Sequence, residues 1–160
     1  MISNAKELFG FMDTLLKPQG YLRKKDTYYL VTSECICFFC IIKSDFGGYY
    51  EDLMGCFVKG VYDGKDEFPK YYKNNLKYVL NYFVDSNLVK EVFDLENKTY
   101  VANEREFLIK ELIEMYVIPF LKDISTKEGI RAAIHKYKEL KYYMDYDLRS
   151  ALGISIEDQH

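Results

Sequence analysis

The hydrophobic pattern of the chain centres on one apolar run from Cys35 to Ile42, which a Gly47-Gly48 turn follows. Eight consecutive apolar residues, rich in β-branched and aromatic types, are typical of a buried β-strand. Successive side chains of a strand point to opposite faces of the sheet. We expect one face to carry Cys35, Cys37, Phe39 and Ile41, and the other to carry Ile36, Phe38, Cys40 and Ile42. Both faces are apolar, so both need a cover.

Polar turns divide residues 21–62 into short extended segments around this run. The turns lie at Arg23–Asp26, at Ser33-Glu34 and at Asp45–Gly48. Connections this short cannot make the crossover that joins parallel strands, so consecutive segments pair antiparallel. The pattern predicts an antiparallel β-meander over about residues 21–62.

An amphipathic helix is predicted ahead of this sheet. Asn4 followed by Glu7 forms a capping-box pattern, which marks the start of a helix. Apolar residues then recur every three or four positions up to Leu16, and Pro18 and Gly20 end the pattern. This apolar stripe is expected to dock the helix on the sheet.

The second half of the chain shows mostly helical spacing. Helices are predicted over 69–83, from Asn103 with a kink or an end near Val117–Pro119, from Ser125, and from Met144 to a stop at Gly153. The pattern does not decide between helix and strand over residues 88–102, within which 92–102 could form a hairpin or one late strand. Together the elements predict an α+β fold, with a helical C-terminal half packed on the sheet. The chain has neither a linker nor a repeat, so we expect one domain over 1–153 and a loose tail over 154–160.

Composition narrows the class of protein. The chain has 160 residues, of which 49% are apolar and 29% charged, as is typical of a globular domain. Residues 1–80 carry 11 Lys and Arg against 10 Asp and Glu, and residues 81–160 carry 11 against 15, so the second half is acidic. This balance offers no basic face for nucleic acid. We see neither a signal peptide nor an apolar run that could span a membrane, and expect a soluble cytoplasmic protein.

The cysteines carry the most specific motif, a C-x-x-C spacing at Cys37 and Cys40. A redox pair of this kind needs its first thiol at a helix N-terminus, whereas both of these lie within the predicted strand and face opposite ways. The same alternation keeps Cys35, Cys37 and Cys40 from converging on a zinc ion. We therefore predict buried, unreactive thiols, no metal site and no cofactor.

Catalytic groups are scarce. His160 is the last residue, so Cys56 with His135 is the one nucleophile–base pair to consider. The neighbouring carboxylates Glu51 and Asp52 point to opposite sides of a strand and cannot act as a pair. A glycine-rich phosphate loop is also missing. We predict a protein without enzyme activity.

The order of elements resembles a known family. An N-terminal helix runs into the stretch Leu15–Lys25, an aromatic strand follows at Thr27-Tyr28-Tyr29, and Thr99-Tyr100-Val101 precedes a helix that ends in Val117–Leu121, with Ser125–Glu128 after it. These features, over residues 3–140, resemble the bacterial family known as domain of unknown function 4304. That family has no established activity, so the resemblance implies no catalytic residue. Small bacterial domains of this kind often lie beside toxin systems, which implies a protein partner.

Two surfaces are candidates for binding. Acidic and aromatic residues gather late in the chain, where carboxylates steer a basic partner and rings supply contact area: Tyr142, Tyr143, Asp145, Tyr146 and Asp147. They favour a non-enzymatic protein-binding module, in its most concrete form an immunity protein that neutralises a basic toxin. The alternative is a small-molecule pocket between sheet and helices, lined by Tyr28, Phe38, Tyr50 and Tyr72. A homodimer stays open, because a second subunit could cover one apolar face.

Overall fold

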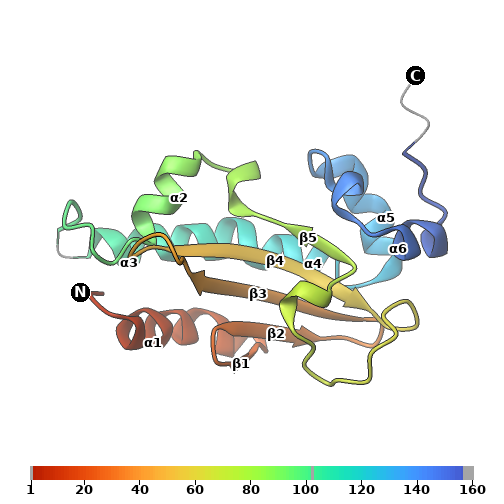
Figure 1. Cartoon of the computed structure of the whole chain (residues 1–160), viewed down its shortest axis with the longest axis horizontal. Coiled ribbons are helices and arrows are strands. Elements are labelled where there is room, and N and C mark those ends of the chain that lie inside the picture. Colours follow the sequence, from red (N-terminus) through yellow and green to blue (C-terminus); the bar gives the residue numbers. More distant parts are fainter. Residues whose placement is uncertain (1, 102, 157–160) are drawn as a thin grey trace.

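The computed structural model describes residues 2–101 and 103–156 and has an α+β fold (Figure 1). In this part of the chain five antiparallel strands form one sheet: β1 (Leu22–Lys24), β2 (Thr27–Val31), β3 (Cys35–Lys43), β4 (Tyr50–Val58) and β5 (Leu76–Tyr78). Each strand pairs with its neighbours in the chain, in the order β1-β2-β3-β4-β5. The predicted fold class and the meander are confirmed, and β5 extends the meander by one strand.

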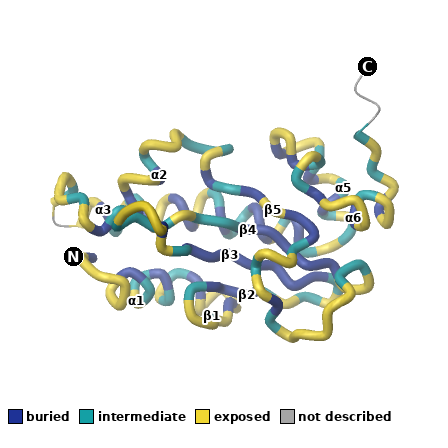
Figure 2. Tube along the Cα trace, viewed as in Figure 1, coloured by how far each residue is buried: buried dark blue, intermediate teal, exposed yellow. Residues whose placement is uncertain are grey.

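Strand β3 is buried on both faces, as its apolar run predicts (Figure 2). One set of side chains enters the main core, and the alternate set forms or borders a second, smaller cluster on the other face of the sheet. The main core takes Cys35, Cys37, Phe39 and Ile41; the second cluster takes Ile36, Phe38 and Cys40, with Ile42 packed against it. The two-sided alternation of this strand is therefore confirmed.

The second cluster is covered by the segment that links β4 to β5. Phe68 and Tyr71 from this segment pack against it, and the ring centroids of Tyr29 and Phe68 are 5.2 Å apart. The Tyr29 hydroxyl donates a hydrogen bond of 2.7 Å to the carbonyl of Pro69, which ties the segment down. This segment therefore covers the second apolar face of the sheet. A homodimer was expected because a second subunit could have covered one of the two faces. A homodimer itself stays a prediction.

Helix α1 (Ala5–Leu16) begins where the capping box places it. The Asn4 side chain accepts a 2.9 Å hydrogen bond from the backbone N–H of Glu7, and the buried face of the helix joins the main core. Asp13 anchors the helix to the sheet, because it accepts hydrogen bonds from Arg23 at 2.9 Å and from the Tyr28 hydroxyl at 2.7 Å. Burial acts to raise the pKa of Asp13, but these hydrogen bonds outweigh it and lower the pKa.

The main core is covered further by C-terminal helices: α3 (Glu104–Leu112), the π-helical η4 (Ile113–Val117), α4 (Ile118–Asp123), α5 (Lys127–Lys136), the 3₁₀ turn η5 (Leu140–Tyr143) and α6 (Tyr146–Leu152). Figure 1 shows α3 and α4 running behind β4. Among the described helices, none combines the length and the apolar character needed to cross a bilayer.

The ends of these helices differ from the prediction at Pro119, at Thr126 and at Ile154, and agree with it at Gly153. Around Pro119 the helix does not end; it widens into the π-turn η4, because a proline offers no N–H to the carbonyl four residues earlier. Thr126 caps α5 in place of Ser125, through a hydrogen bond from Gly129 N–H. Gly153 ends α6 with a left-handed φ of 69°, as expected. Ile154 still packs on the core, and residues 157–160 of the predicted tail lie outside the described residues.

The helix predicted over 69–83 is wrong. This segment forms the 3₁₀ turn η2 (Tyr71–Lys73), strand β5 and the 3₁₀ turn η3 (Leu80–Tyr82). In β5 Leu76 and Tyr78 are buried while Lys77 is exposed, which is strand alternation. Three residues are too few for this alternation to outweigh the helical spacing of the apolar residues around them.

In the ambiguous segment 88–102, the described residues form neither the hairpin nor the late strand. Helix α2 (Ser86–Val92) occupies the first part, with Asp85 accepting a 2.7 Å hydrogen bond from Asn87 N–H as its cap. The rest of the segment makes one isolated bridge, between Tyr49 and Asp94, and Val101 is exposed. Ala102, the last residue of the predicted strand, lies outside the described residues.

Candidate functional site

The residues predicted to bind a partner divide into two kinds. Tyr142 and Tyr146 are exposed, at 48% and 73% of their surface, and Asp147 is exposed beside them on α6. Tyr143 is half-buried and its hydroxyl meets that of Tyr82. Asp145 caps α6 by accepting a 2.8 Å hydrogen bond from the N–H of Leu148. Four of the five residues are therefore exposed, and one of these, Asp145, also has a structural role as a helix cap.

Asp145 and Asp147 line a hollow of about 350 Å³ together with two aspartates from a distant part of the chain, Asp63 and Asp66. We call these four aspartates the acidic face. Lys73 is the one basic residue in the lining of this hollow. The lining of the hollow therefore carries four carboxyl groups and one ammonium group, and its net charge is negative.

Asn75 ties Asp145, at the start of α6, to the end of β4. The side-chain N–H of Asn75 donates a 2.9 Å hydrogen bond to the Asp145 carboxyl. The backbone carbonyl of Asn75 accepts a 2.8 Å hydrogen bond from the backbone N–H of Asp145. Its side-chain oxygen accepts a 2.8 Å hydrogen bond from Val58 N–H, which fixes Asn75 to the end of β4. Asn75 is buried, so these contacts hold the segment before β5 against the start of α6.

The four residues predicted to line a small-molecule pocket do not meet. Tyr28 is fully buried in the main core, whereas Phe38 is fully buried in the second cluster on the other face of the sheet. Tyr72 is 65% exposed on η2. Tyr50 lines a hollow, but none of the other three shares it. The predicted pocket is therefore not formed.

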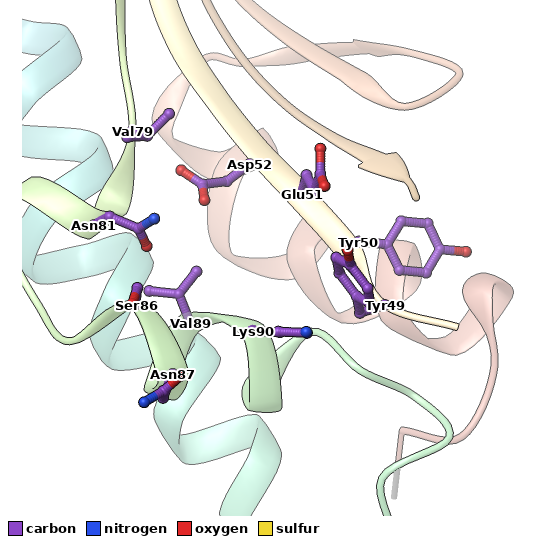
Figure 3. Close-up of a pocket in the computed structure, with 10 residues that line it drawn as sticks. All are labelled: Tyr49, Tyr50, Glu51, Asp52, Val79, Asn81, Ser86, Asn87, Val89 and Lys90. Carbon is purple, nitrogen blue, oxygen red and sulfur yellow. The ribbon is translucent and has the colours of Figure 1, made fainter. Parts of the chain in front are cut away.

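One of the two hollows that Tyr50 lines, of about 360 Å³, lies between the start of β4, the turn η3 and helix α2 (Figure 3). It exists because β5 leaves β4 early. The two strands pair only through Met54↔Tyr78, Gly55↔Lys77 and Cys56↔Leu76. Beyond this point the chain turns away at η3, so among the described residues β4 has no strand partner on that side from Glu51 to Leu53. At Tyr50 the backbone N–H donates a 3.0 Å hydrogen bond to the Phe93 carbonyl.

Asp52 stands at the point of divergence. In Figure 3 its carboxyl extends from β4 toward Val79 and Asn81, while Glu51 points to the other side of the strand. Continuing the register of β4 and β5 places Leu80 opposite Asp52. The Leu80 N–H, which would otherwise bond the β4 backbone, donates a 2.7 Å hydrogen bond to the Asp52 carboxyl. The Asp52 side chain thus takes the place of a backbone acceptor in one hydrogen bond between β4 and the segment that follows β5.

The environment of Asp52 favours its neutral form. Burial raises the pKa of this carboxyl to about 6, and the negative charge of Glu51 adds to the effect. The hydrogen bond from Leu80 acts in the opposite direction but does not offset the burial. A carboxyl that is costly to ionise and lies in a hollow is a recognised mark of a functional site, although ordinary structural networks also produce it.

Replacing Asp52 with asparagine is expected to raise the free energy of unfolding at pH 7 by about 1 to 2 kcal/mol. The folded state holds the Asp52 proton with a pKa of about 6, against 3.8 ordinarily, so the wild-type protein loses stability as the pH rises through this window. Asparagine keeps an oxygen for the Leu80 N–H but carries no charge. Urea unfolding at pH 7 and at a pH below 4 measures the difference in the free energy of unfolding between the variant and the wild type. The two proteins should become equally stable at the lower pH, and a variant that is weaker at both would contradict the assignment.

The cysteine pairs considered from the sequence are not assembled, although the hydrogen bond with Cys56 lowers the pKa of Cys35. Cys37 and Cys40 face opposite sides of the sheet, and burial raises the pKa of both. Cys56 is fully buried, and its hydrogen bond to Cys35 together with burial raises its pKa well above the ordinary value. His135, its predicted partner, is exposed on α5. The nucleophile–base pair is therefore not assembled. Within residues 2–101 and 103–156, the His, Cys, Asp and Glu side chains form no group of three or more that could hold a metal ion.

Sequence reasoning found Asp145 and Asp147 but missed Asp63, Asp66 and the role of Asp52. Comparison of the chain with protein-family models, with curated proteins and with solved structures found no match. The resemblance to the domain of unknown function 4304 family stays a prediction.

Proposed function

We propose that this protein is a non-enzymatic binding module that recognises a basic segment of another protein through its acidic face. The observation that carries the proposal is the convergence of Asp63 and Asp66 with Asp145 and Asp147 around one hollow. These carboxyls come from segments about 80 residues apart in the chain, and Asn75 ties one of them, Asp145, to Val58 at the end of β4. Four carboxyls around one lysine repel one another, so a bound cation would stabilise the arrangement.

The hollow suits the side chain of a lysine or an arginine. Carboxylates on several sides give a guanidinium or ammonium group more than one hydrogen-bond acceptor. The exposed ring of Tyr146, between Asp145 and Asp147 in the chain, adds the kind of contact area that anchors protein interfaces. The negative potential would also steer a basic partner toward this side of the molecule.

The concrete form of the proposal is an immunity protein that neutralises a basic toxin. Its support is the acidic face together with the resemblance to a family of small bacterial domains, a kind of domain often found beside toxin systems. We place this role in the cytoplasm, because all four cysteines are free and a reducing compartment keeps thiols in that state.

A capture experiment with charge variants tests the proposal. The immobilised protein is exposed to a lysate of its host at low salt, alongside a variant with Asp63→Asn, Asp66→Asn and Asp147→Asn. Asp145 is left intact because it caps α6. A matched control removes three exposed carboxyls elsewhere, through Asp45→Asn, Glu111→Gln and Glu114→Gln. Circular dichroism checks that all three proteins are equally folded.

We expect one protein with a basic surface to be retained by the wild type and by the control, and to be lost from the acidic-face variant. Retention should also fall as salt is raised, because ions screen charges at the surface. If the acidic-face variant retains the same protein as the control, or if the wild type retains none, the proposal is wrong.

A further inference from the structure

The hollow beside Asp52 presents a carboxyl for which the described residues supply no basic partner. Its one described hydrogen bond from another residue comes from a neutral group, the backbone N–H of Leu80. The other charged group that influences it is Glu51, which has the same sign. Burying a carboxylate without a counter-charge is unfavourable, so a cation bound in the hollow would supply the charge that balances it.

The remaining walls of the hollow are compatible with a cation. Asn81, Ser86 and Asn87 contribute neutral polar side chains. Lys90 also lines the hollow, but its ammonium group lies over the ring of Tyr49, 4.7 Å from the ring centroid. In Figure 3 this ammonium is beside Tyr49 and Asp52 is on the far side of the hollow. Lys90 is therefore engaged at the rim, and its contact shows that an aromatic ring here accommodates a cation.

A purely structural role does not account for the charge of Asp52. Its carboxyl closes the gap that β5 leaves, but an asparagine oxygen could accept the same hydrogen bond from Leu80 without the cost of burying a charge. Residues that lower stability in this way are common at binding sites, where the cost is recovered when the ligand binds.

We propose that this hollow is a second binding site, which takes a small organic cation with an alkylammonium or guanidinium group against the Asp52 carboxylate. The volume of about 360 Å³ is at the lower end of the range for small-molecule sites. The site is separate from the acidic face, since the two hollows share no lining residue. It does not depend on the function proposed above.

The test uses n-butylammonium and N-methylguanidinium as probes and neutral n-butanol as their control. Each is titrated into ¹⁵N-labelled protein at pH 7.5, and the backbone N–H signal of Leu80 reports the state of Asp52. Asp52→Asn removes the proposed counter-ion and keeps an acceptor for Leu80. Glu111→Gln, on the exposed side of α3, is the matched loss of one carboxylate.

At least one cation should move the Leu80 signal in a saturable way, in the wild type and in Glu111→Gln alike, and n-butanol should not. Asp52→Asn should bind at least about tenfold more weakly. The wild type should also lose about tenfold in affinity between pH 7.5 and pH 5, because a carboxyl with a pKa of about 6 is mostly protonated at the lower pH. The other charged groups in the lining are Glu51 on β4 and Lys90 on α2.

Three results would overturn the proposal. One is the absence of saturable binding of either cation to folded wild type. Another is equal binding by Asp52→Asn, whose fold the same spectra verify. The third is equal binding of n-butanol, which would show an apolar site without charge selection. None of these results bears on the acidic face, because its test changes other residues.

Discussion

Replacing Gly55 with alanine is expected to lower the free energy of unfolding by about 3 kcal/mol or more. Gly55 lies in β4 opposite Lys77 of β5, where the two backbones approach closely. A Cβ atom at this position would lie 1.9 Å from the Leu76 carbonyl oxygen and 2.9 Å from its carbon. These are backbone atoms and cannot rotate away, so β5 would have to move.

Urea unfolding followed by circular dichroism measures this change, with Gly10→Ala as the control. Gly10 is exposed on α1 and a Cβ there meets no atom within 4 Å, so alanine should stabilise the helix by up to about 1 kcal/mol. A loss below about 1 kcal/mol for Gly55→Ala would show that β5 does not lie this close to β4. The position of Leu80 against Asp52 would then also be in doubt, since it follows from the same register.

Replacing Phe38 with alanine should destabilise the protein by about 3 to 5 kcal/mol, the usual cost of removing a fully buried aromatic ring. Phe38 is in the second cluster, where its ring centroid is 5.6 Å from that of Phe57. The cavity left behind would lie beneath the segment that links β4 to β5. We therefore expect this segment to loosen as well, with faster hydrogen exchange around Tyr71.

Phe46→Ala is the control for this prediction. Phe46 lies in the turn between β3 and β4 and is 91% exposed, so its removal should change the free energy of unfolding by less than about 0.5 kcal/mol. If the two variants were equally stable, the second face of the sheet would not be packed, and the cover over β3 would be incomplete.

The parts of the fold that could be predicted are those in which a local pattern agrees with the tertiary environment. The apolar run in β3 has period-two alternation on both faces, and it could be buried only in a sheet covered on both sides. The start of α1 follows from Asn4, whose cap is a contact within one turn. Such features depend on neighbours in the sequence.

The segments predicted wrongly are those whose structure depends on distant partners. Strand β5 has three residues, and it is a strand because the edge of β4 is there to bond it. Helix α2 was missed although Val89, Val92 and Phe93 are buried at helical spacing, because Val92 and Phe93 also fit a strand. Short apolar runs of this kind do not distinguish helix from strand on their own.

The candidate sites could be predicted only in part, for the same reason. Composition identified Asp145 and Asp147, but the hollow that they share with Asp63 and Asp66 is made by segments distant in the sequence. The hydrogen bond between Asp52 and Leu80 could not be predicted, because Leu80 lies in a segment that the pattern predicts as helix. No local pattern reports a hydrogen bond across 28 residues.

The acidic face depends on the cover over the two faces of β3, since the segment over one face and the helices over the other each contribute to it. The four thiols report directly on this cover: Cys40 on one side and Cys35, Cys37 and Cys56 on the other, all fully buried. The decisive measurement is labelling with N-ethylmaleimide, read by intact mass, in native buffer and in denaturant. We predict no labelled cysteine in the native protein over the time in which all four react in the unfolded chain. Prompt labelling of Cys40, or of any of the other three, while circular dichroism remains native would contradict the account.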